Sequence, residues 1–264
     1  MIPKKIHYCW FGGNEKPKLF EKCYKSWKKH CPDYEIIEWN ESNFELSACP
    51  LYVRQAYEAK KWAFVTDYVR LKVVYDNGGI YLDTDVELKK NLDFLLDNKA
   101  FFGFEQGKYI NTGIGFGAEK GADILREIMQ DYDGIPFVKE DGSFDTLSCP
   151  RRNTEIFIRH GLKQNDSMQY VDGDILILPT IYLCPISFES GKRKLSFKTV
   201  SVHWFSASWY EGKNFREKIK KQQVLYNRQK KAEKIDRIKH LPNLFLMRML
   251  GNQRYNALKN KIEK

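Results

Sequence analysis

The sequence lacks the cysteine spacing of a disulfide framework or of a zinc-binding domain. It also lacks a long apolar segment. No segment approaches the roughly 20 apolar residues of a membrane-spanning helix, and the start of the chain has no apolar signal-peptide core. The cysteines include no CxxC pair; they are Cys9, Cys23, Cys31, Cys49, Cys149 and Cys184. These absences predict a cytosolic protein with free thiols, and a Cys23–Cys31 disulfide is the less favoured alternative.

Acidic residues are scarce in the C-terminal part of the chain. Residues 212–264 hold 16 Lys and Arg against four acidic residues, a net charge of +12. Residues 1–211 hold 28 against 30, a net charge of −2, so the tail accounts for the formal +10 of the 264-residue chain. This contrast predicts two parts with different roles, a domain over 1–211 and a basic, helical C-terminal extension over 212–264.

The hydrophobic pattern of the first part predicts an α/β fold. Residues 5–11 and 34–39 are expected to form strands around a helix that begins after Pro17. A long helix is expected over residues 51–76, and a Gly-Gly turn at 78–79 ends it. The remaining expected strands are 80–82, 86–88, 100–104, 113–117, 174–179 and 199–204, and the remaining helices are 122–129 and 153–160. Together these elements predict a mixed, mostly parallel sheet flanked by helices.

The triplet Asp83-Thr84-Asp85 is the strongest candidate for a functional motif. It directly follows the apolar strand 80–82, and ligands of open α/β sheets bind at the carboxyl ends of strands. Two carboxylates at that position suit a hard cation such as Mg²⁺ or Mn²⁺, which leaves coordination sites for phosphate oxygens. Such triplets are also common on solvated turns, so the position after the strand is what favours a functional site.

Asp67 and Arg70 form an i, i+3 pair on the preceding, almost wholly apolar helix. A buried helix requires its ionised groups to have partners, so a purely structural ion pair is one interpretation. A carboxylate beside a guanidinium also suits a polyhydroxylated ligand, since the pair can both accept from and donate to hydroxyl groups.

Three blocks of this sequence resemble glycosyltransferase family 32. The specific block combines Ala63–Arg70 with Asn77–Asp85 and is similar to the family's sugar-binding region with its DxD motif. Residues 2–13 resemble the family's first strand, and residues 203–209 resemble its closing His-x-x-x-x-Ser-Trp element. The resemblance spans most of residues 1–211 and implies a GT-A type nucleotide-sugar-binding fold.

The resemblance also implies roles for individual residues. Asp85 would bind the metal directly, and Asp83 would contact the donor's ribose and the metal through water. Asp67 and Arg70 would hold hydroxyls of the donor sugar. Cys9 and Trp10 would contact the base of the donor, Tyr81 its ribose and Asn111 its sugar. His203, Ser208 and Trp209 would close over the diphosphate and the metal.

The implied reaction is a retaining, metal-dependent transfer of a hexose from a nucleotide sugar to a saccharide acceptor, typical of capsular or other cell-surface polysaccharide synthesis. The cofactor would be Mn²⁺ or Mg²⁺, and a UDP-sugar is favoured over a GDP-sugar. No nucleophile for double displacement is evident in the sequence. Trp10 and His203 have a simpler interpretation as core residues, and the Gly12-Gly13 pair lacks the spacing of a dinucleotide fingerprint.

The basic tail alternates Lys and Arg with apolar residues, including an apolar run at 244–250. This pattern predicts adsorption to an anionic membrane surface, and hence a cytoplasmic protein peripheral to the inner face of the membrane, where a lipid-linked acceptor would lie. A nucleic-acid partner is not expected, because the near-neutral body has no recognisable binding module. Two alternatives stay open at this point, a metal-dependent phosphohydrolase and a non-catalytic membrane-surface adaptor acting through the tail.

Overall fold

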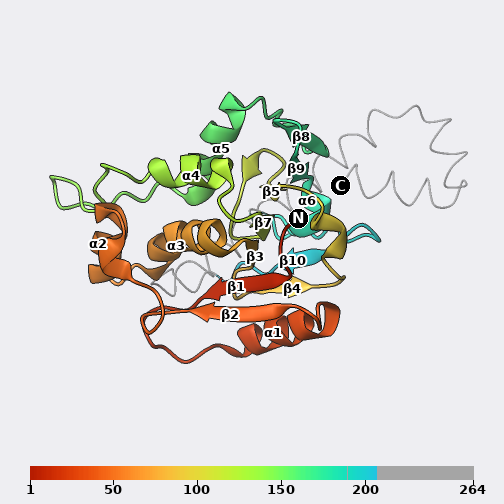
Figure 1. Ribbon diagram of the computed structural model, residues 1–264, viewed down its shortest axis with the longest axis horizontal. Coiled ribbons are helices and arrows are strands. Elements are labelled where there is room, and N and C mark those ends of the chain that lie inside the picture. The colour runs from red at the N-terminus through yellow and green to blue at the C-terminus, as the bar shows by residue number, and fades with distance from the viewer. Residues whose placement is uncertain (189, 207–264) are drawn as a thin grey trace, which may run out of the picture. The chain divides into compact units, whose positions relative to one another are not determined.

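A computed structural model describes residues 1–188 and 190–206 (Figure 1). An eight-stranded sheet has the order β2-β1-β3-β7-β5-β9-β8, with β6 paired to β5. Its strands are β1 (Lys5–Cys9), β2 (Glu35–Trp39), β3 (Gly79–Tyr81), β5 (Ala100–Glu105), β6 (Tyr109–Ile110), β7 (Phe116–Ala118), β8 (Gln169–Val171) and β9 (Ile175–Leu178). Strands β2, β1, β3, β5 and β9 run in one direction, while β6, β7 and β8 run against them. The predicted α/β fold with a mixed, mostly parallel sheet is therefore confirmed.

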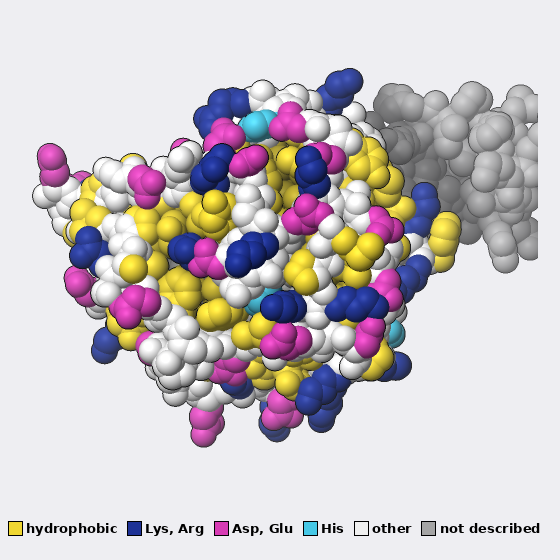
Figure 2. Space-filling view, viewed as in Figure 1, with side chains coloured by type: hydrophobic (Ala, Val, Ile, Leu, Met, Phe, Trp, Pro, Cys, Tyr) yellow, Lys and Arg dark blue, Asp and Glu magenta, His cyan; other side chains and the backbone are white. Residues whose placement is uncertain are grey.

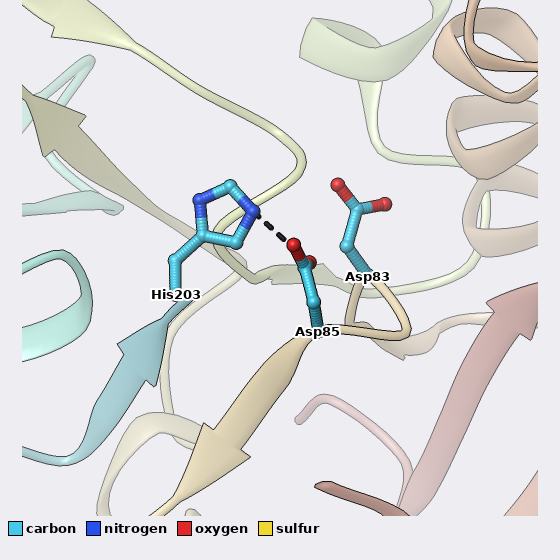
Figure 3. Close-up of side chains that lie close together, drawn as sticks. All are labelled: Asp83, Asp85 and His203. Atoms are coloured by element: carbon cyan, nitrogen blue, oxygen red, sulfur yellow. Dashed lines mark ion pairs between the residues drawn. The ribbon is translucent and has the colours of Figure 1, made fainter. Parts of the chain in front are cut away.

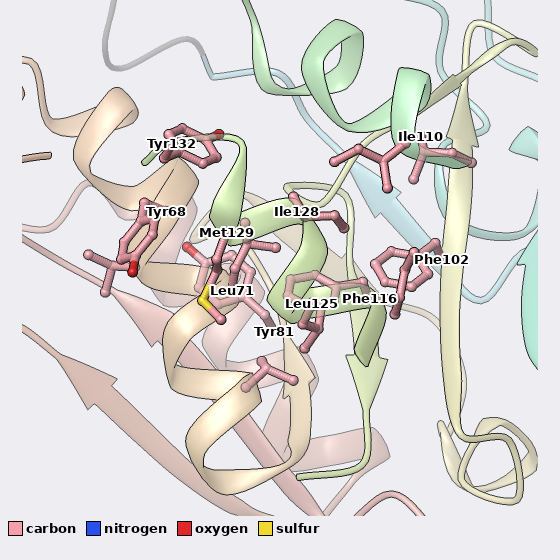
Figure 4. Packing of buried hydrophobic residues seen from close by; sticks show 14 of the residues in the cluster. Tyr68, Leu71, Tyr81, Phe102, Ile110, Phe116, Leu125, Ile128, Met129 and Tyr132 are labelled. Carbon is pink, nitrogen blue, oxygen red and sulfur yellow. The ribbon is translucent and has the colours of Figure 1, made fainter. Parts of the chain in front are cut away.

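Helices cover both faces of this sheet (Figure 1). They are α1 (Lys18–His30), α2 (Leu51–Glu58), α3 (Trp62–Asn77), α4 (Asp123–Gln130), α5 (Cys149–Arg159) and the short α6 (Thr180–Leu183), with 3-10 turns at Leu46–Ala48 and Asp93–Leu95. Neighbouring strand residues alternate between two cores: Phe102 packs with α3 and α4, and Phe101 packs on the side of α1. Figure 4 shows Tyr81, Phe102 and Phe116 of the first core beside Leu125 and Ile128 of α4.

The prediction of a single helix over residues 51–76 is wrong. The chain forms two helices there, with a break at residues 59–61. Lys60 adopts a left-handed φ of 56°, and the amides of Lys60 and Lys61 bond back to the carbonyls of Tyr57 and Ala56. These backbone bonds end α2 in the manner of a helix C-cap. Tyr57 and Trp62, on either side of the break, then pack edge to face with ring centroids 5.3 Å apart.

A second, two-stranded sheet brings the end of the described chain back beside the Asp-x-Asp turn. Strand β10 (Ser201–His203) pairs antiparallel with β4 (Val86–Leu88), and His203 lies opposite Val86. Helix α1 packs against β4, where the Trp27 indole donates to the Val86 carbonyl at 2.8 Å. The ladder therefore sets the position of His203 relative to residues 83–85.

The prediction of free thiols is confirmed. All six cysteines are buried free thiols. Among the residues that the structure describes, no helix has both the length and the apolar character needed to cross a membrane. The predicted extension over residues 212–264 lies outside the described residues.

Candidate metal and nucleotide-sugar site

Asp83, Asp85 and His203 come together at the carboxyl end of β3. Their ligand atoms all lie within 4.8 Å of one another, and Figure 3 shows the imidazole and both carboxyl groups converging. Strand β3 ends at Tyr81, and the turn that follows delivers both aspartates before β4 begins at Val86. Asp83 and Asp85 were expected at the metal from their position after the strand, and His203 from the family resemblance; the structure brings all three together.

Asp85 is held in place from several sides. Its Oδ1 lies 3.1 Å from His203 Nε2, and its Oδ2 accepts from the Ser206 amide at 2.7 Å. Its backbone carbonyl accepts from the Trp204 amide at 3.1 Å. Burial raises the pKa of Asp85, but the charge and hydrogen bonds of His203 and Ser206 outweigh it, so the pKa lies well below its usual range. Asp85 is therefore a fixed carboxylate rather than a proton carrier.

The imidazole of His203 faces the carboxylate of Asp85, which favours its charged form. Burial disfavours its charged form, yet the carboxylate of Asp85 raises the pKa of the imidazole well above its ordinary value. A metal ion would require the neutral imidazole, so binding of a cation and loss of this proton would be coupled.

Arg70 links Asp67, its partner on α3, to the Asp-x-Asp turn. Its Nη2 lies 3.2 Å from Asp67 Oδ1 and 3.3 Å from Asp83 Oδ1, and its Nε donates to the Thr66 carbonyl at 2.9 Å. Only 5% of the Arg70 side chain is exposed, against 26% for Asp83, so Asp83 is the more accessible end of the array. Burial raises the pKa of Asp67 and of Asp83, and Arg70 offsets part of this effect.

A glycine turn lies against this array of charges. A Cβ on Gly113 would lie 2.4 Å from Asp83 Oδ2 and 2.8 Å from Arg70 Nη1. Asn111 shapes the turn, because its Oδ1 accepts from the Gly113 amide at 2.6 Å while its amide group donates to Glu105. The strand expected over 113–117 starts only at Phe116, and residues 111–115 instead form a loop that approaches the carboxylates.

Of the other residues expected at the donor site, Tyr81 belongs to this array and Cys9 lies beside Tyr81. The Tyr81 hydroxyl donates to Asp83 Oδ1 at 3.0 Å, and its ring lies 5.1 Å from the Arg70 guanidinium carbon. Cys9 is buried, and burial raises the pKa of its thiol to about 12. Trp10 is half-buried and donates to the Asn14 carbonyl at 2.7 Å. Ser208 and Trp209 lie outside the described residues.

Sequence reasoning missed a second polar cluster directly beyond the site. Glu87 is buried and accepts from the Trp204 indole at 2.9 Å, and its carboxylate pairs with Lys22 at 2.7 Å and Lys89 at 2.6 Å. The alternation of Val86-Glu87-Leu88 would place Glu87 on the face opposite the two apolar side chains, so the sequence gives no signal that Glu87 is buried or that Lys22 lies beside it. The cluster fixes Trp204, and with it the backbone amide that holds Asp85.

The donor set fits a divalent cation. Two carboxylates and one imidazole supply oxygen and nitrogen ligands of the kind that Mn²⁺ accepts, and Asp83 leaves the site partly open. The position of the group at the carboxyl end of β3 matches the rule for ligand sites in open α/β sheets.

Comparison with known proteins agrees with this geometry. Residues 17–102 match the family model described as the glycosyltransferase sugar-binding region containing the DXD motif. The predicted resemblance to glycosyltransferase family 32 is therefore confirmed over a segment that contains Asp67, Arg70, Asp83 and Asp85.

Two curated proteins are similar in sequence to part of this chain. An inositol phosphoceramide mannosyltransferase 3 of Schizosaccharomyces pombe is 31% identical over 140 residues, which are 52% of this chain and 38% of that protein. An uncharacterized glycosyltransferase of Acanthamoeba polyphaga mimivirus is 35% identical over 111 residues, 39% of this chain and 43% of that protein. The chain thus spans about two fifths of the length of these relatives. Among solved structures, the PaToxG glycosyltransferase matches with a TM-score of 0.48 at 18% identity, over 60% of this chain and 69% of that one.

Proposed function

We propose that this protein transfers a hexose from a nucleoside diphosphate sugar to a saccharide acceptor with the help of a divalent metal ion. The observation that carries the proposal is the convergence of Asp83, Asp85 and His203 within a chain whose residues 17–102 match the DXD sugar-binding region. Mn²⁺ is the expected ion, with Mg²⁺ as its substitute.

When bound, the cation would neutralise the diphosphate leaving group as the glycosidic bond breaks. Asp85, Asp83 and His203 would hold it. Side chains of the protein preorganise the rest of the site. Arg70 pairs with both Asp67 and Asp83, so the orientation of the two carboxylates is fixed before a donor sugar binds. The Gly113 turn keeps side-chain atoms away from Asp83.

The proposal includes finer expectations. We expect a UDP-sugar donor. Because the Schizosaccharomyces pombe relative is a mannosyltransferase, a mannose-carrying donor is the alternative to test beside it. Transfer with retention of the anomeric configuration, a role in capsular or other cell-surface polysaccharide synthesis and a lipid-linked acceptor also belong to the proposal. So does peripheral attachment to the inner membrane face through residues 212–264, whose +12 charge suits anionic lipid.

A calorimetric screen of UDP- and GDP-sugars tests the donor and the metal together. We expect one nucleotide sugar to bind in the presence of Mn²⁺ and to lose most of its affinity when a chelator is added. Binding that is unaffected by the chelator would contradict the metal site.

Turnover distinguishes transfer from the competing activity. A metal-dependent phosphohydrolase would consume the donor at full rate without any saccharide, whereas a transferase would accelerate when the acceptor is added and form a new glycosidic bond. Analysis of the product by NMR would give its anomeric configuration. A protein that bound no nucleotide sugar and turned over none would instead support the adaptor alternative.

A further inference from the structure

Positive charge is also concentrated in three segments that lie outside residues 212–264 of the sequence. Three segments, α1, residues 86–90 and the loop 192–198, hold eleven Lys and Arg against two acidic residues, Glu21 and Glu87, a net charge of +9. The rest of residues 1–211 holds 17 against 28, a net charge of −11. We call the surface of these three segments the basic face.

The three segments are adjacent in the fold. The Lys89 amide donates to the Val200 carbonyl at 2.7 Å, and the Lys90 ammonium donates to the Phe197 carbonyl. The Trp204 ring joins α1 to the loop, since Lys22 Nζ lies 4.3 Å and the Arg193 guanidinium carbon 5.4 Å from its centroid. Basic residues from all three segments therefore belong to one surface.

A shallow groove of this face lies between α1 and β4. It is lined by Lys22, Lys25, Ser26, Lys29, His30 and Lys89, above the buried Glu87. Glu87 accepts from Lys22 and Lys89, so it neutralises part of their charge, and no ion pair is found within the described chain for Lys25 and Lys29. Such a groove offers surplus positive charge to an external anion.

Two large apolar side chains project from the same face. Phe197 is 82% exposed and Leu195 is 55% exposed, and each lies between basic residues of the loop 192–198. In Figure 1 this loop projects from the body beside β10, and Figure 2 shows apolar side chains flanked by Lys and Arg at that edge. Backbone bonds, including Lys194 to Pro185 at 2.8 Å and Ser187 to Lys192 at 3.0 Å, tie the loop to the preceding segment.

We propose that the basic face is a docking surface for an anionic phospholipid bilayer, with Phe197 and Leu195 entering the interface. Basic side chains around exposed aromatic and aliphatic residues are the combination that lipid interfaces favour, because the charges attract the headgroups and the apolar groups partition into the acyl boundary. None of the residues of the basic face belongs to the C-terminal extension over 212–264. It would place the end of β10, and with it the Asp85–His203 pair, close to the membrane.

Matched triple variants of the full chain test the surface. The variant Lys25→Gln, Lys29→Gln, Lys194→Gln removes three charges of the basic face without touching the lysines that hold Glu87. The control Lys108→Gln, Lys139→Gln, Lys163→Gln removes three exposed lysines of the same charge elsewhere. Both variants retain residues 207–264, so any contribution of the tail is common to them.

Co-sedimentation with phosphatidylcholine vesicles, with and without phosphatidylglycerol, is the measurement. Each basic residue at an anionic surface contributes about fivefold in affinity, so the first variant should bind the anionic vesicles roughly 100-fold more weakly, while the control changes little. Equal losses in both variants, or no loss in the first, would overturn the proposal. So would unchanged vesicle binding accompanied by a selective loss of binding to inorganic diphosphate or to single-stranded RNA.

A fluorescent variant tests insertion independently. Phe197→Trp should shift its emission to the blue when anionic vesicles are added, whereas Leu147→Trp, on the exposed loop before α5, should not. Matching emission changes for the two variants would show that Phe197 does not enter the interface.

Discussion

Arg70 Nη2 lies 3.3 Å from Asp83 Oδ1, joining a side chain buried in α3 to the first carboxylate of the Asp-x-Asp turn. Because the same nitrogen lies 3.2 Å from Asp67 Oδ1, one guanidinium group sets the spacing of both carboxylates. Arg70 therefore acts as a positioning residue, in addition to any contact that it makes with a ligand.

Replacing Arg70 with lysine should separate this positioning from charge. A lysine keeps the positive charge but lacks the planar fork, so it can hold only one of the two carboxylates well. We expect transfer to fall by about 10- to 100-fold and the free energy of unfolding to fall by about 1–3 kcal/mol. Kinetics and urea denaturation measure these effects.

Arg126→Lys is the matched control for this change, because Arg126 forms an exposed i, i+3 pair with Asp123. It should alter the free energy of unfolding by no more than about 0.5 kcal/mol. If Arg70→Lys changed activity and the free energy of unfolding no more than this control does, Arg70 would have no positioning role between Asp67 and Asp83.

Asp85→Asn should abolish metal-dependent transfer. The substitution keeps the shape of the side chain but removes the negative charge that faces His203 Nε2 at 3.1 Å. We expect activity to fall by about 100-fold or more, with loss of Mn²⁺ binding in calorimetry and a native circular dichroism spectrum. Asp76→Asn, at an exposed pair with Lys72, is the control and should retain activity. Undiminished, chelator-insensitive turnover in Asp85→Asn would contradict the site.

Gly113→Ala should damage the site through steric contact alone. Its Cβ would lie 2.4 Å from Asp83 Oδ2, so the carboxylate or the turn must move. Donor affinity, measured by calorimetry, should fall by at least about tenfold.

Gly134→Ala provides the comparison, since Gly134 has a left-handed φ of 75° and no atom within 4 Å of the added Cβ. That variant should lose about 1 kcal/mol of stability and keep its donor affinity. Equal donor binding in both variants would show that the Gly113 turn does not limit the site.

His7 should make the fold less stable in mild acid. Its Nδ1 accepts from the Trp39 indole at 3.0 Å and its Nε2 donates to the Gly78 carbonyl at 2.8 Å, which fixes a neutral ring. Burial lowers the pKa of His7 to about 4, whereas the unfolded chain titrates near 6.5. Between these two values the unfolded state binds more protons, so the free energy of unfolding falls as the pH falls, by up to about 3 kcal/mol.

Urea denaturation between pH 7.5 and pH 4 measures this dependence, and His7→Gln is the matched variant. Glutamine retains one donor and one acceptor but does not titrate, so the variant should show a shallower decline. Parallel curves for the two proteins would assign the acid sensitivity to other groups.

The sequence was sufficient for the sites that depend on short-range spacing. Asp83 and Asp85 follow a predicted strand, and Asp67 and Arg70 share a helical face, so their placement follows from strand and helix periodicity. His203 was expected at the metal through a resemblance, and the β4–β10 ladder supplies the physical reason.

Tertiary contacts explain what could not be predicted. The break at Lys60 combines a left-handed backbone with packing of Tyr57 against Trp62, and local helix propensity cannot anticipate that contact. The loop character of residues 111–115 depends on the Asn111–Gly113 bond beside Asp83. The contacts of Glu87 with Lys22 and Trp204 join segments far apart in the sequence, and no periodicity reports such pairings.

The antiparallel pairing of β10 with β4 has a consequence for biosynthesis. The Ser206 amide that holds Asp85 lies 121 positions later in the chain, and His203 is the last residue of β10. During translation the aspartates emerge long before their partners, so a nascent chain has no complete cation site until β10 has left the ribosome and paired. The complete arrangement of the three side chains would therefore form only after β10 has paired with β4.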